Sequence, residues 1–163
     1  MPHTAAILPD GPYAVVSCHV EQPLDDAVWA RFSRFQESTP FRVAALMRPP
    51  ADGEDEGRWL DRARAAAARG PLGHHTHFGG ARQARPTGGD AAALVRREGA
   101  WLREHGLEPT LFCGGAWYLD AEVAHDVAEL GYADCSATAF RPAYLAPGAP
   151  RVGPWPRPCW WSV

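Results

Sequence analysis

The sequence predicts an α/β protein in which β/α repeats build a parallel sheet. Short apolar runs alternate four times with amphipathic helical patterns, and a fifth apolar run follows the last helix. Connections of this length between strands force parallel pairing with right-handed crossovers. The chain has 163 residues, which suits one domain, and its 46% of hydrophobic residues can form a sizeable core. The sheet is expected either to stay open or to curl into a barrel.

The first two repeats follow from apolar runs and helix signals. Residues 13–20 form an apolar, partly β-branched strand. Asp25 or Asp26 then caps a helix whose aromatic residues, at spacings of three and four, share one face. Residues 41–47 form the second strand, which two prolines stop. The acidic loop 52–56 precedes the second helix, where the helix dipole favours negative charge.

The later repeats carry the same signals. Residues 71–78 are the third strand and its exit, and a loop rich in glycine and arginine follows. Asp90 caps the third helix, residues 109–113 form the fourth strand, and Asp120 caps the fourth helix. Residues 132–138 complete the pattern as a fifth strand.

The repeats indicate one domain over residues 1–144. The tail, residues 145–163, is irregular and rich in proline and tryptophan, so it allows no long helix or strand. Trp160 and Trp161 are adjacent near the last residue, and two adjacent tryptophans are unusual at the terminus of a soluble monomer. We expect the chain to be truncated, or its last residues to be an out-of-frame tail.

Composition excludes several kinds of partner. Charged residues make up 21% of the chain and the net charge is -3, which implies no nucleic acid partner. No segment approaches the roughly 18 apolar residues of a membrane span, and no signal peptide is visible. We therefore expect a cytoplasmic protein without a membrane partner. The four cysteines form no C-x-x-C pair, which argues against a structural zinc knuckle and favours buried, hydrophobic cysteines.

Histidines mark the ends of two predicted strands, where parallel α/β folds bind their ligands. His19 and Glu21 end the first strand, and His74, His75 and His77 end the third. On an extended segment His75 and His77 point to one face, whereas a tight turn brings His74 and His77 together. Glu21 is the nearest carboxylate by topology and would complete a three-ligand metal site. A solvated histidine loop, an exposed Glu21 and a core His19 are the alternatives.

Four segments of the chain resemble, in order and spacing, the motifs of the polysaccharide deacetylases, also called NodB-like carbohydrate esterases. The segments are Ser17-Cys18-His19-Val20-Glu21, Leu72-Gly73-His74-His75-Thr76-His77-Phe78-Gly79-Gly80, residues 111–120 and residues 130–138. The resemblance runs from about Tyr13 to Tyr144 and covers the leading, incomplete part of the domain. It implies an incomplete, distorted β/α barrel of the glycoside hydrolase and deacetylase type.

The resemblance also implies metal-assisted hydrolysis of an acetyl group on a carbohydrate or related small substrate. The cation would be zinc or a similar divalent metal ion. By position the family's roles fall on Glu21, His75 and His77 as metal ligands, on His19 as the base, and on Gly115 and Trp117 near the substrate.

The sequence departs from the family pattern at several positions. His19 stands where the family has an aspartate base. The family's two histidines lie four positions apart, so the partner of His75 falls at Gly79, and only His77 is near. The arginine of the third motif is missing, and no histidine after Tyr144 supplies the family's general acid. The chain by itself is therefore expected to lack a complete active site.

Two other functions remain open from the sequence. A His-x-His segment at a strand end also begins the metal site of PHP-type phosphoesterases and amidohydrolases. Those enzymes place it after their first strand, whereas here it follows the third, which favours the deacetylase. The missing last motif favours a third alternative, a non-catalytic barrel fragment.

Overall fold

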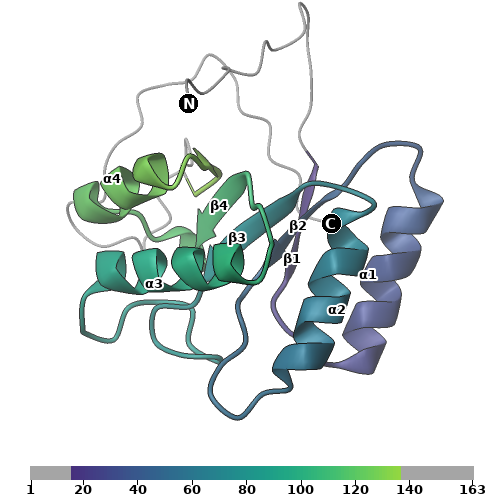
Figure 1. Cartoon of the computed structure of the whole chain (residues 1–163), viewed down its shortest axis with the longest axis horizontal. Coiled ribbons are helices and arrows are strands. Elements are labelled where there is room, and N and C mark those ends of the chain that lie inside the picture. Colours follow the sequence, from purple (N-terminus) through teal and green to yellow (C-terminus); the bar gives the residue numbers. More distant parts are fainter. Residues whose placement is uncertain (1–15, 137–163) are drawn as a thin grey trace, which may run out of the picture.

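A five-stranded parallel sheet and four helices make up residues 16–136, the part of the chain that the computed structural model describes (Figure 1). In chain order the elements are β1 (Ser17–Val20), α1 (Asp26–Ser38), β2 (Ala44–Met47), α2 (Glu56–Ala67), β3 (Leu72–Thr76), α3 (Ala91–Glu104), β4 (Leu111–Gly114), the 3-10 turn η1 (Gly115–Trp117), α4 (Ala121–Glu129) and β5 (Ala133–Asp134). The strands lie in the order β1-β2-β3-β4-β5, all parallel. The predicted α/β class and its repeat order are confirmed.

Several strands are shorter than the sequence predicted. β2 begins at Ala44 and not at residue 41, because Phe41 and Arg42 lie exposed in the connection after α1. β5 covers two residues, and residues 137 and 138 of the predicted fifth strand lie outside the described part. The predicted tail, residues 145–163, also lies outside it. None of the helices within residues 16–136 is long and apolar enough to span a membrane.

Aspartate side chains begin all four helices, and at α1, α3 and α4 the sequence predicted these caps. At α1 the choice falls on Asp25, whose carboxylate accepts hydrogen bonds from the backbone N–H groups of Ala27 and Val28. Asp26 instead pairs with two arginines of α2. The other caps are Asp55, Asp90 and Asp120. Each cap typically stabilises its helix by about 0.5–2 kcal/mol, because it satisfies an unpaired N–H group of the first turn.

All the helices cover one face of the sheet. The strand residues packed beneath them lie in two rows of the register, Cys18-Ala45-Leu72 and Val20-Met47-His74-Phe112. Alternate residues of a strand point to opposite faces, so the residues between these rows belong to the other face. They are His19, Leu46, Gly73 and Leu111. His75 and Cys113 follow the second row and belong to the same opposite face. Figure 1 shows the helices following one another from α1 on the right to α4 on the left.

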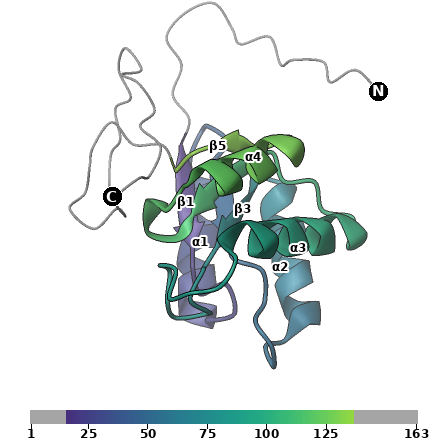
Figure 2. The same cartoon turned by 90° about the vertical axis from the view of Figure 1, so that its left-hand side faces the viewer.

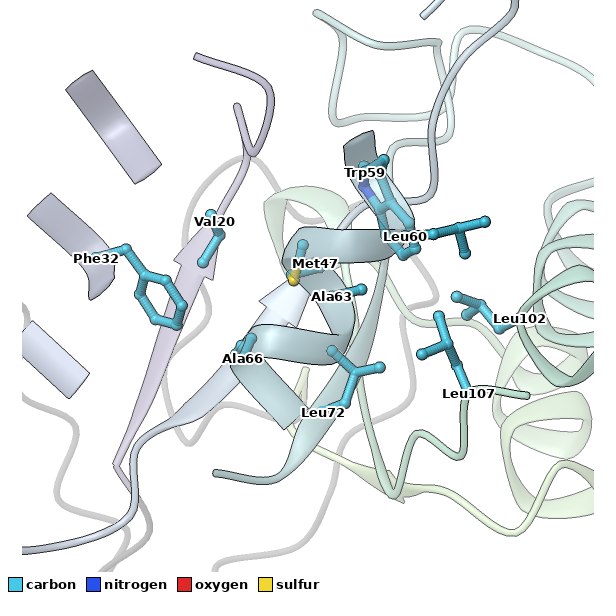
Figure 3. Close-up of a cluster of buried hydrophobic side chains, with 11 residues drawn as sticks. Val20, Phe32, Met47, Trp59, Leu60, Ala63, Ala66, Leu72, Leu102 and Leu107 are labelled. Carbon is cyan, nitrogen blue, oxygen red and sulfur yellow. The ribbon is translucent and has the colours of Figure 1, made fainter. Parts of the chain in front are cut away.

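Two clusters of buried hydrophobic side chains attach the helices to the sheet. In the first, Phe32 of α1 and Trp59 of α2 pack against β1, β2 and β3 (Figure 3). Trp59 is fully buried and donates its indole N–H to the Arg48 carbonyl at 2.7 Å. The second cluster joins α3 and α4 to Phe112 of β4, and both helices lie in front of the strands in Figure 2. Each large side chain buried in this way contributes about 1.5–3 kcal/mol.

An ion pair holds the connection between β2 and α2 at the carboxyl end of β2. The buried guanidinium of Arg48 donates to both carboxylate oxygens of Glu54, at 2.9 and 2.8 Å. Glu54 also accepts a hydrogen bond from the backbone N–H of Ala51 at 2.7 Å. This two-pronged geometry fixes the loop in place beside the exit of β3.

A polar network lies buried between β3 and α3. His74 Nε2 donates to Glu98 Oε2 at 2.9 Å, and the Thr76 hydroxyl donates to the same oxygen at 2.8 Å. The His74 ring stands edge-on to Phe112 and Tyr132 in the core. His74 is therefore a core histidine whose Nε2 atom is paired with a carboxylate from the covering helix, while its buried Nδ1 atom has no partner among the described residues.

We predict that Glu98→Ala lowers the free energy of unfolding by about 1–3 kcal/mol, because it leaves buried polar groups of β3 without their acceptor. Arg97→Ala, at the next and exposed position of α3, is the control and should change stability by less than about 0.5 kcal/mol. Urea titration followed by circular dichroism measures both. Equal effects of the two substitutions would show that the network contributes nothing.

Candidate metal centre

Strand alternation separates the three histidines at the end of β3. His74 faces the helices, whereas His75 projects from the opposite face of the sheet. His77 comes two residues after His75, and the centroids of their rings lie 4.9 Å apart. Of the two alternatives that the sequence left open, His75 and not His74 therefore lies with His77.

Glu21 reaches the same space from β1. The register across β2 puts Val20 level with His74, so the next residues, Glu21 and His75, also lie level. Glu21 Oε1 is 3.9 Å from His75 Nε2. The donor atoms of Glu21, His75 and His77 all lie within 4.8 Å of one another. The fold thus brings together the three residues predicted to hold a metal ion.

Backbone carbonyls hold both imidazoles in one tautomer. His75 Nδ1 lies 2.7 Å from the Cys113 carbonyl oxygen, and His77 Nδ1 lies 3.0 Å from that of Ala81. Because a carbonyl only accepts, each Nδ1 carries the hydrogen and each Nε2 keeps its lone pair. Both Nε2 atoms are buried and have no hydrogen-bond partner within residues 16–136. Histidines that bind metals are oriented by their second nitrogen in the same way.

This donor set fits a divalent cation of the zinc type. Two buried lone pairs without partners share a space with the carboxylate of Glu21, whose side chain is 54% exposed. Imidazole nitrogen and carboxylate oxygen are ordinary ligands of zinc. Three protein ligands would leave a coordination position open for water or substrate.

Burial keeps the imidazole of His75 neutral near pH 7. Burial, assisted by the neighbouring His19, lowers the pKa of His75 from 6.5 to about 3. Burial also lowers the pKa of His19, while Glu21 acts in the opposite direction. Cations bind the neutral form of imidazole. Near neutral pH the His75 ring therefore needs to lose no proton before it binds a metal ion.

His19 lies between the three-ligand group and an exposed tryptophan. Its ring centroid is 4.6 Å from that of His75 and 6.3 Å from that of Trp117. Ala116 and Trp117 both have left-handed backbone, with φ of 52° and 57°, which costs roughly 1–2 kcal/mol for each non-glycine residue. Such strain persists where the surrounding fold requires it, and often at functional sites. Here it places an aromatic face beside the predicted base.

The two glycines that precede this turn permit close backbone packing. A Cβ atom on Gly114 would lie 2.0 Å from the Tyr118 carbonyl oxygen, and one on Gly115 would lie 2.3 Å from that of Ala84. Gly115 is buried. Its observed role is the close approach of η1 to the loop after β3, and its contact with a substrate stays a prediction.

A pocket opens beside the candidate metal centre. It has a volume of about 650 Å³ and lies at the carboxyl ends of β2 and β3. His77 forms part of its wall, together with the charged residues Arg48, Glu54, Arg97 and Glu98. A molecule bound in this pocket would therefore lie next to His77, one of the three candidate metal ligands.

Sequence reasoning missed one donor near the site, the thiol of Cys113. Cys113 pairs with His75 in the register of β3 and β4, so both side chains project from one face. Its donor atom lies within 4.8 Å of those of His19 and His75. The sequence contains no signal for this neighbour, because only the register between two strands places it there.

No protein-family model matches the chain, and no curated protein or solved structure shows significant similarity to it. The interpretation of this site therefore depends on its own residues and their geometry.

We predict that the stability of the metal-free protein falls by about 2 kcal/mol between pH 7 and pH 5, because His75 is neutral when folded. In the unfolded chain this imidazole takes up a proton below pH 6.5, whereas in the folded chain it does so only near pH 3. Lower pH therefore favours the unfolded chain. Urea titrations in the presence of a chelator measure the effect.

The matched variants are His75→Gln, which removes the titratable imidazole but keeps a polar side chain, and His125→Gln at an exposed position of α4. The first should remove most of the pH dependence in this range and the second should keep it. An unchanged slope in His75→Gln would contradict the prediction.

Proposed function

We propose that the chain binds one divalent cation, zinc or a similar ion, through Glu21, His75 and His77. The observation that supports this most directly is the pair of buried Nε2 atoms, each without a partner and each backed by a carbonyl at Nδ1. An unpaired buried polar atom costs about 1–3 kcal/mol. Binding of a cation to both atoms would recover that cost.

We further propose that the chain belongs to the metal-dependent hydrolases of the polysaccharide deacetylase type and removes acetyl groups from a carbohydrate or a related small amide. The motif order in the sequence supports this activity, and so does the meeting of its first and second motifs at Glu21, His75 and His77. The sheet would then be part of an incomplete, distorted barrel. Doubly wound sheets reverse their strand order, whereas barrels keep it sequential, as here.

The residues around the centre suit hydrolysis of an acetyl group. Glu21, His75 and His77 would hold the cation, which would supply polarisation of the substrate carbonyl and a lower pKa for the attacking water. The neutral ring of His19, beside His75, is placed to accept the proton of that water. Trp117, 39% exposed next to His19, offers an apolar face against which a sugar ring can pack.

A PHP-type phosphoesterase or amidohydrolase is the second candidate. Its metal site also begins with a His-x-His segment at a strand end, and here His75 and His77 turn into one space. Both candidates predict the same ligands and differ in the bond that is broken. A non-catalytic fold that keeps the metal ligands is the third, because the chain has no histidine at the family's general acid position.

The purified chain should bind about one equivalent of zinc, and His75→Ala or His77→Ala should weaken binding by at least about 10–100-fold, the loss seen even for residues that only orient a ligand. Glu21→Gln should weaken it less, since the carboxylate is half exposed and keeps a neutral oxygen donor. Isothermal titration calorimetry measures the affinities.

His125→Ala is the matched control for zinc binding, because it removes an exposed imidazole from α4. Equal affinity in the wild-type protein, in His75→Ala and in His77→Ala would overturn the proposed centre.

The zinc-loaded chain should release acetate from N-acetylated or O-acetylated sugars, and a chelator should abolish the release. Enzymatic detection of acetate, set beside phosphate release from phosphoesters, measures the activity. Phosphate release would favour the second candidate instead. Release of neither product by a chain that binds zinc would leave the third.

A further inference from the structure

The sheet face that carries His75 has a second group of possible ligands. His19, His75 and Cys113 each place one donor atom within 4.8 Å of the others. They come from β1, β3 and β4, and all three project from the face opposite to the helices. The second group therefore offers two imidazoles and a thiol, whereas the first offers two imidazoles and a carboxylate, and the two groups share His75.

The thiol of Cys113 is buried in the protein, next to the buried imidazole of His75. Cys113 is 1% exposed, and its thiol contacts the carbonyl of its neighbour Gly114 at 3.7 Å and the side chain of Ser136. His75 is equally buried, and its Nε2 atom has no partner among the described residues. An unpaired, buried imidazole nitrogen beside a buried thiol is the independent observation that points to a bound cation.

We propose that His19, His75 and Cys113 form a site for a thiophilic divalent cation, with Cys113 bound as the thiolate. The thiol would release its proton to solvent as the cation binds. Neighbouring nitrogen and sulfur ligands of tetrahedral zinc lie about 3.5 Å apart, so the three donors need to close by about 1 Å, which side-chain rotation supplies. Sulfur ligands select zinc, cadmium or cobalt over magnesium and calcium.

This inference rests on the proposed function in one respect, because both groups use His75. The Nε2 lone pair of one imidazole binds one cation, so the two groups compete. A cation at the thiol group would also engage His19, the predicted base. A thiophilic cation bound there should therefore inhibit the proposed hydrolysis, whereas a cation held by Glu21, His75 and His77 supports it.

Cobalt reports the two groups separately, because a thiolate ligand gives Co²⁺ a charge-transfer band in the near ultraviolet that imidazole and carboxylate ligands do not give. The test is a titration of the full-length chain with Co²⁺ under a phosphine reductant. We expect the charge-transfer band in the wild-type protein and its loss in Cys113→Ser, with the weaker visible bands of nitrogen-bound cobalt retained.

Two variants serve as controls. Cys135→Ser removes a half-buried thiol that belongs to neither group, and His77→Ala removes a ligand of the first group alone. Both should keep the charge-transfer band, and circular dichroism shows whether each variant is folded.

Absence of the band in wild-type protein that binds cobalt would overturn the thiol site and leave the first group standing. A band that survives in Cys113→Ser, or that disappears in Cys135→Ser or His77→Ala, would overturn it too. A chain that binds no cobalt and no zinc would overturn both proposals. A thiolate band in the wild-type protein, together with no acetate release from zinc-loaded Cys113→Ser, would support the thiol site while removing the hydrolase.

Discussion

The rest of the structure depends on one constraint in β3. Its side chains alternate between the two faces of the sheet, and the register with β2 and β4 fixes which residues point to which face. One face of β3 carries His74 and Thr76 into the core beneath α3, where Glu98 accepts a hydrogen bond from each of them. The other face carries His75 toward β1 and β4. A shift of the register by one residue would exchange these faces. It would carry His75 to the face beneath the helices and move His74 and Thr76 to the opposite face, away from Glu98.

The same arrangement explains why neighbouring imidazoles differ in chemistry. His74 has a carboxylate at Nε2, so this nitrogen is occupied and the ring serves the core. His75 and His77 have carbonyls at Nδ1, so their Nε2 lone pairs stay free. Burial then lowers the pKa of His75 and keeps the ring neutral. Hydrogen-bond partners therefore decide which imidazoles can act as ligands, although the residue type is the same.

Next to the candidate metal centre, two residues adopt strained backbone conformations. Ala116 and Trp117 adopt left-handed backbone directly after β4, although the two glycines that tolerate it best precede them. Those glycines are needed for another reason, because a Cβ atom on either would collide with a backbone carbonyl oxygen. The glycines thus occupy the positions where η1 packs closely against neighbouring backbone, and the left-handed conformations fall on Ala116 and Trp117. The result is an aromatic side chain held beside His19.

Much of the fold and part of the site follow from the sequence by itself. Hydrophobic periodicity determined the β/α order, aspartates determined where the helices begin, and alternation alone suggests that His75 and His77 share a face, because each of these effects acts within a few residues. Tertiary structure decided the rest. The register between strands that helices separate comes from packing of the whole sheet, and only that register puts Glu21 and Cys113 beside His75, and Glu98 beside His74. Distances between such residues depend on long-range packing, about which a local pattern carries no information.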